Sequence, residues 1–287
     1  MYFAYGTIFE DNSPSRRQRS GARFFSSGIT MTTDSHSDFK SIQEKLSGRI
    51  SRLVRNTTGC YSYDAEMMAK EIHTIIGDIS NSLLNDAPDV ALQVADLLLK
   101  CDGVLLYSVD DSSGMVAAEF KTLPLIWITA AENAGHSTEY LVSLLRELTE
   151  VDDFGFRGEV VRRCPHLIGT EDIHSLADEF REALLREKAA ESESDEFFFD
   201  QRTITHYATM MMHCAVACND PVLFEEGATL QFSRDPVGRQ ALDVTTMYLA
   251  TGQVSVAKDR LLKFDFSPFE QERDLLEKEL NLYREKK

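Results

Sequence analysis

The chain has 287 residues, of which 43% are hydrophobic and 27% are charged, so it has enough apolar material for one large or two small globular domains. Its formal net charge of -17 opposes binding to nucleic acid and to anionic membrane surfaces, because both are polyanions. No apolar run reaches the length of a membrane span, so we expect a soluble chain with neither partner.

The cysteines show no regular framework along the chain. They are Cys60, Cys101, Cys164, Cys214 and Cys218. An odd number of scattered cysteines is typical of reduced thiols, and we therefore expect a cytoplasmic protein.

Residues 1–34 differ in composition from the rest. From Asn12 to Thr33 there are four arginines, many Ser and Thr, and no acidic residue. An organelle transit peptide has a similar composition, but Glu10, Asp11 and the absence of an amphipathic pattern stand against that interpretation. We interpret residues 1–34 as a flexible, disordered leader.

From about Ser37 onward, apolar residues recur at spacings of three and four, with almost no alternation of period two. This pattern predicts an all-α fold. Asp64 is placed to cap the second helix, and Pro88 suits the first turn of the third.

The stretch of residues 89–131 is the most apolar long segment and holds the only tryptophan, Trp127. Its spacing predicts a helix, a tight turn at residues 110–114 and a second helix. Pro124 should kink or divide that second helix near Thr122, because proline lacks the backbone N–H. We expect Trp127 to be buried where this hairpin meets its neighbours.

The run of residues 186–200 loses its apolar face and ends in three phenylalanines, which we expect to dock on a neighbouring layer. It divides the chain into an N-terminal helical domain, residues 35–192, and a C-terminal helix-pair region, residues 193–287. In that region Tyr248, Gly252 and Ala257 sit where a tetratricopeptide-type unit has an aromatic residue, a turn and a small residue. The sequence therefore predicts antiparallel helix hairpins stacked as an α-solenoid-like array.

Three features together resemble a known family: VDDSSG at residues 109–114, DDFGFRGEVV at residues 152–161 and the C-terminal helix pairs. The chain after about Ser37 is similar to an uncharacterised bacterial family of all-helical domains, whose members sometimes follow a SWIM-type zinc finger. The resemblance implies an all-helical fold and a bacterial cytoplasm, and it carries no activity. The Cys/His spacing of the finger is missing here, so no role of the finger is implied.

Two acidic turns are the candidate metal sites. Asp110 and Asp111 lie in one, and Asp152 and Asp153 lie in the other. A calcium loop needs alternating acids and a glycine at its sixth position, but Gly114 comes one place early, and helix capping explains the same residues. If the two turns converged in space, one carboxylate would show a raised pKa.

His213, Cys214 and Cys218 are the nearest approach to soft metal ligands, since the two cysteines are four residues apart. Zinc sites usually also take ligands from a turn, so core packing explains these residues better. The sequence contains no nucleophile elbow, phosphate-binding loop or dinucleotide fingerprint. We therefore expect no cofactor.

Two functions agree with these patterns. The first is a non-enzymatic helical-repeat scaffold that binds another protein, with residues 201–264 as the surface and a basic partner matching the acidic charge. The second is a metal-dependent or hydrolytic enzyme that uses Asp110, Asp111, Asp152 and Asp153.

Overall fold

The computed structural model describes residues 33–57, 64–193 and 201–285, which form fifteen α-helices. Within those ranges there is no strand, and the one β-bridge, between Val237 and Asp265, is isolated. The predicted all-α fold is thus confirmed. Helix α1 begins at Thr33, so the last two residues of the predicted leader are helical, while residues 1–32 and the three phenylalanines at 197–199 lie outside the described residues.

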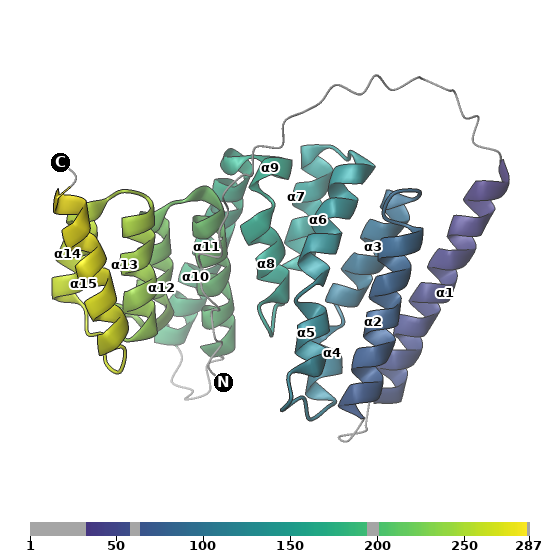
Figure 1. The fold of residues 1–287 in the computed structure, drawn as a ribbon, viewed down its shortest axis with the longest axis horizontal. Helices are drawn as coiled ribbons and strands as arrows, with labels where there is room; N and C mark the ends of the chain where they lie inside the picture. The colour runs from purple at the N-terminus through teal and green to yellow at the C-terminus, as the bar shows by residue number, and fades with distance from the viewer. Residues whose placement is uncertain (1–32, 58–63, 194–200, 286–287) are drawn as a thin grey trace.

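The helices follow one another along the longest axis of the molecule, from α1 at one end to α14 and α15 at the other (Figure 1). The first half contains α1 (Thr33–Thr57), α2 (Ala65–Ser82), α3 (Pro88–Leu99), α4 (Asp102–Tyr107), α5 (Met115–Phe120), α6 (Leu123–Ala134) and α7 (Thr138–Leu148). The second half contains α8 (Phe156–Arg163), α9 (Pro165–Ile168), α10 (Thr170–Glu193), α11 (Gln201–Cys218), α12 (Pro221–Phe232), α13 (Arg239–Ala250), α14 (Val254–Lys263) and α15 (Glu270–Glu285).

The helix starts agree well with the local sequence. The Asp64 side chain accepts hydrogen bonds from the backbone N–H groups of Glu66 and Met67, at 2.9 and 3.1 Å, and so caps α2 as predicted. Pro88 occupies the first turn of α3, where its missing N–H costs no helical hydrogen bond.

The apolar segment of residues 89–131 contains four helices, α3 to α6, where the sequence predicted two. The break between α5 and α6 at Lys121 and Thr122 is the one that Pro124 predicts. The break between α3 and α4 was not predicted. A residue from far along the chain contacts this break, where Arg157 donates to the Lys100 carbonyl at 3.1 Å and pairs with Asp102 at the start of α4.

Trp127 lies in α6, which packs against α3 and α8. Its side chain is 0% exposed, and its indole Nε1–H donates to Asp96 Oδ1 at 3.3 Å. The predicted burial is confirmed. The indole nitrogen has found a polar partner, as buried tryptophans usually do.

The C-terminal helices form antiparallel pairs whose turns need a left-handed residue. Gly252 has φ of +77° between α13 and α14, and Asn219 has φ of 54° between α11 and α12. Asparagine tolerates this conformation better than other non-glycine residues, which explains how the first pair turns without a glycine. Ala257 is fully buried in α14.

Helices α10 and α11, on the two sides of the predicted boundary at residue 193, pack against each other.

Candidate functional site

The first acidic turn shapes the start of α5. Asp111 accepts hydrogen bonds from the backbone N–H groups of Val116 and Ala117, at 3.1 and 2.8 Å. Asp110 accepts from the N–H of Ser112 at 3.2 Å. Both carboxylates therefore satisfy backbone donors of their own turn, which is the capping role that the sequence also allowed.

The second acidic turn does the same for α8. Asp152 accepts from the N–H groups of Gly155 and Gly158, at 2.8 and 2.7 Å, and burial raises the pKa of this carboxyl while those bonds oppose the rise. The Asp153 carboxylate lies against Gly103 of α4, so close that a Cβ on Gly103 would be 2.7 Å from Asp153 Oδ2. Among the described residues, no three His, Cys, Asp or Glu side chains are grouped so as to hold a metal ion.

A buried ion pair that the sequence did not reveal joins these two regions. The Asp102 side chain is 0% exposed and pairs with the guanidinium of Arg157, which also donates to the carbonyls of Val151 and Lys100. Burial raises the pKa of Asp102 to about 6, although the attraction of Arg157 opposes the rise. This pair ties α4 to α8 across more than fifty residues of sequence. No local spacing signals such a contact.

His213 and the nearby cysteines belong to the packing between α8 and α11. His213 is buried, and burial lowers its pKa to about 4, so the ring is neutral at pH 7. Burial raises the pKa of Cys218 to about 11 and that of Cys214 further, so both are protonated thiols. Thiols in this state are poor nucleophiles. The four cysteines in the described ranges are free, and Cys60 lies outside those ranges.

The best candidate for a binding site is a hollow of about 540 Å³ in the C-terminal helix pairs, which we call the α12–α14 groove. Helix α12 contributes every residue at positions i, i+3, i+4, i+7 and i+8, from Val222 to Leu230. The opposite side consists of Gln253, Val256 and Arg260, and α13 contributes Tyr248. Two of these five α12 residues, Val222 and Leu230, are apolar, and the other three are polar.

Polar contacts fix the shape of the α12–α14 groove. The Tyr248 hydroxyl donates to Glu225 Oε2 at 2.7 Å, and Arg260 Nε lies 2.8 Å from Glu225 Oε1. The Arg260 guanidinium also lies over the Tyr248 ring, 5.8 Å from its centroid. These contacts cross-link α12, α13 and α14, so the groove is a preformed feature of the helix stack.

Apolar and acidic side chains occur together in the α12–α14 groove. Val222 is 61% exposed, and Glu225 and Glu226 come one turn later on the same face. Glu226 is paired with Arg181 of α10 through two hydrogen bonds of 2.7 and 2.8 Å. The spacing on α12 is readable in the sequence, whereas the approach of α14 is visible only in the structure.

No protein-family model, no curated protein and no solved structure matches this chain. The resemblance to the bacterial helical family and to tetratricopeptide units therefore stays a prediction. None of the helices in the described ranges is both long and apolar enough to cross a membrane.

Proposed function

We propose that this chain is a non-enzymatic helical scaffold that binds a basic segment of another protein in the α12–α14 groove. One observation carries the proposal: five residues on one face of α12, among them Val222, which is 61% exposed, border a hollow of about 540 Å³. Such a face offers apolar contact to a partner chain.

The charge of the molecule determines the type of partner. At the α12–α14 groove Glu225 is paired with Arg260 and Glu226 with Arg181, so these charges compensate one another, whereas the whole chain carries a net charge of -17. This field attracts a basic segment and speeds its encounter with the groove. Exposed charges are screened over about 8 Å at physiological ionic strength, so binding should weaken as salt rises.

The alternative, a metal-dependent or hydrolytic enzyme that uses loop carboxylates, has no comparable observation in its favour. Asp111 and Asp152 already accept two backbone hydrogen bonds each. A cytoplasmic location remains part of the proposal and rests on the scattered cysteines, four of which are described as free thiols.

The proposal can be tested with a random peptide library displayed against the full chain. We expect the selected peptides to be rich in Lys and Arg and to bind less tightly at higher salt. In Val222→Lys the binding of a selected peptide should fall at least tenfold, because a cation then replaces the exposed apolar contact at the groove.

Leu262→Lys is the matched control for this experiment. Leu262 is 81% exposed in α14 and does not line the groove, and its replacement makes the same change in net charge. Binding to Leu262→Lys should stay within about twofold of the parent value. Equal losses in the two variants, or selection of peptides without basic residues, would count against the proposal.

A further inference from the structure

The α12–α14 groove has a helical wall on each side. Helix α13 packs against both α12 and α14, and Figure 1 shows the three helices side by side toward the C-terminal end of the molecule. Val222 and Leu230 border the hollow at the two ends of the α12 wall, and Val256 borders it from α14. At about 1.5 Å per residue, the stretch from Val222 to Leu230 spans about 12 Å. The α12 wall is therefore about two helical turns long.

Backbone hydrogen bonds decide which conformation of a bound segment suits this groove. Along the lengths of α12 and α14, the backbone N–H and C=O groups already bond within each helix. At the start of α12, the Asp220 side chain accepts from the N–H groups of Val222 and Leu223, at 3.0 and 3.1 Å. An extended segment needs a row of free backbone partners, such as the edge of a sheet provides. A helix brings its own backbone hydrogen bonds and needs only side-chain contacts, so these walls favour a helix.

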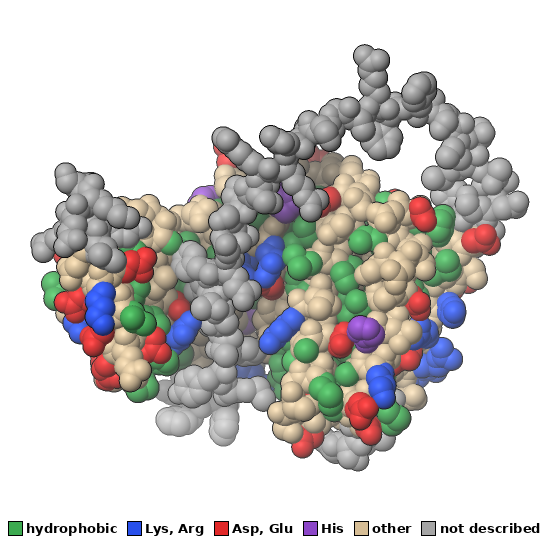
Figure 2. Space-filling view, viewed as in Figure 1, with side chains coloured by type: hydrophobic (Ala, Val, Ile, Leu, Met, Phe, Trp, Pro, Cys, Tyr) green, Lys and Arg blue, Asp and Glu red, His purple; other side chains and the backbone are tan. Residues whose placement is uncertain are grey.

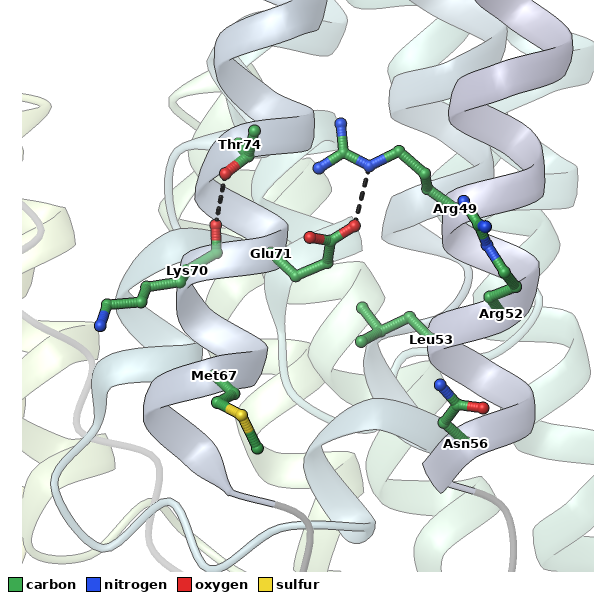
Figure 3. A pocket seen from close by; sticks show the side chains of 8 residues that line it. All are labelled: Arg49, Arg52, Leu53, Asn56, Met67, Lys70, Glu71 and Thr74. Carbon is green, nitrogen blue, oxygen red and sulfur yellow. Dashed lines mark hydrogen bonds and ion pairs between the residues drawn. The ribbon is translucent and has the colours of Figure 1, made fainter.

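Charge distinguishes this groove from a second hollow, of about 430 Å³, which we call the α1–α2 hollow. Three cations and one carboxylate line it, namely Arg49, Arg52, Lys70 and Glu71. Figure 3 shows that Arg49 of α1 bonds Glu71 of α2 across it, at 2.8 Å. Figure 2 shows Lys and Arg side chains gathered over α1 and α2, at the lower right. A basic segment is therefore repelled from the α1–α2 hollow.

The α12–α14 groove has the opposite balance of charge. Glu225 pairs with Arg260 at 2.8 Å, and Glu226 pairs with Arg181 of α10 at 2.7 Å. Arg181 is shared with Asp178, so three carboxylates stand against two cations. The Asp178 side chain is largely exposed, so the surplus negative charge on the α10 side is open to a cation of a partner.

We propose that the segment bound in the α12–α14 groove is an amphipathic α-helix of about two to three turns. Its apolar face lies against Val222, Leu230 and Val256, and its Lys or Arg residues point toward α10. A helix presents apolar residues at positions i, i+3, i+4 and i+7, a stripe that matches the length of the α12 wall. The inference rests on the proposed function, because it specifies the conformation of the basic segment.

Fluorescence anisotropy of the full chain with two labelled peptides of identical Leu and Lys composition tests this inference. The peptide LKKLLKLLKKLLKL places its leucines at helical spacing, whereas LKLKLKLKLKLKLL alternates them as a strand does. We expect the first peptide to bind at least tenfold more tightly, because the second leaves backbone groups unpaired in the groove. Val222→Lys should weaken the binding of the first peptide at least tenfold, since a cation then replaces an apolar contact.

Met67→Lys is the matched control for Val222→Lys. Met67 is 56% exposed and borders the α1–α2 hollow, and like Val222 it lies in the first turn of a helix that an aspartate caps. The two substitutions make the same change in net charge. Binding of the first peptide to Met67→Lys should stay within about twofold of the parent value. Equal losses in the two variants, or no saturable binding of the first peptide, would overturn the inference.

The alternating peptide separates this inference from the proposed function. If it binds as tightly as the first peptide and loses affinity in Val222→Lys, the bound segment is extended. The helical inference then fails, while the scaffold function stands. If a library-selected basic peptide loses no affinity in Val222→Lys, the proposed function itself fails.

Discussion

Replacing Trp127 by alanine should cost more stability than most single substitutions in this chain. The side chain is 0% exposed between α6 and its neighbours α3 and α8. A buried indole removes roughly 150–250 Å² from water, which at about 25 cal/mol per Å² is about 4–6 kcal/mol. Large-to-small replacements of this kind usually cost about 3–5 kcal/mol, so we expect a loss in that range.

Trp127→Phe separates the hydrogen bond from the packing. Phenylalanine keeps much of the apolar contact but removes the indole N–H that Asp96 accepts at 3.3 Å. Asp96 retains Lys100 at 2.8 Å, so the additional polar loss should be about 1 kcal/mol. The phenylalanine variant should therefore be clearly more stable than the alanine variant.

Urea unfolding followed by far-ultraviolet circular dichroism measures both variants, since the substitutions remove the only tryptophan. In the parent protein, the tryptophan emission should be blue-shifted and should move to the exposed wavelength on unfolding. An alanine variant that loses less than about 1 kcal/mol, or native emission already at the exposed wavelength, would refute the reasoning.

Three further predictions concern buried polar groups and close packing. The pKa of Asp102 is raised to about 6 in the folded state, so the free energy of unfolding of the parent relative to Asp102→Asn should fall as pH rises from about 4 to 6. Urea unfolding at a series of pH values measures this, and a difference between the two proteins that does not change with pH would contradict it. The pKa of His213 is lowered to about 4, so the pH dependence is reversed: relative to His213→Gln, the free energy of unfolding of the parent should fall by up to about 3 kcal/mol as pH falls from 6.5 to 4. The same series of unfolding measurements would show no such fall if the ring were solvated. Gly158→Ala should lower the free energy of unfolding by about 1–3 kcal/mol, because its Cβ would lie 2.5 Å from His213 Cδ2, whereas Gly48→Ala, with open space around it, should raise that free energy by about 0.5–1 kcal/mol. Equal effects of the two substitutions in thermal unfolding would disprove the close contact.

Features set by nearby residues were predictable from the sequence. Asp64, Pro88 and Pro124 act within one helical turn of their own position, and each starts or divides a helix where it was expected to. The ion pair between Asp102 and Arg157 joins residues 55 positions apart, so the spacing of residues near Asp102 carries no sign of it.

The candidate sites likewise combine features that nearby residues set with features that depend on distant packing. The stripe from Val222 to Leu230 on α12 follows from helical spacing, but its exposure depends on how α13 and α14 pack. The four carboxylates on the acidic turns were candidate metal ligands because they lie on loops. In the structure, Asp110, Asp111 and Asp152 accept backbone hydrogen bonds of their own turns, which the sequence allowed as one of two interpretations.

Methyl-resolved nuclear magnetic resonance of the full chain, titrated with a library-selected basic peptide, tests the proposed scaffold function most directly. Val222, Leu230 and Val256 line the α12–α14 groove from both sides, whereas Leu262 and Leu275 are exposed apolar residues that do not line it. We predict that the methyl signals of the first three shift on binding, that those of the last two stay in place, and that the shifts diminish as salt rises. Shifts at Leu262 and Leu275 with unchanged signals from the groove would contradict the proposal.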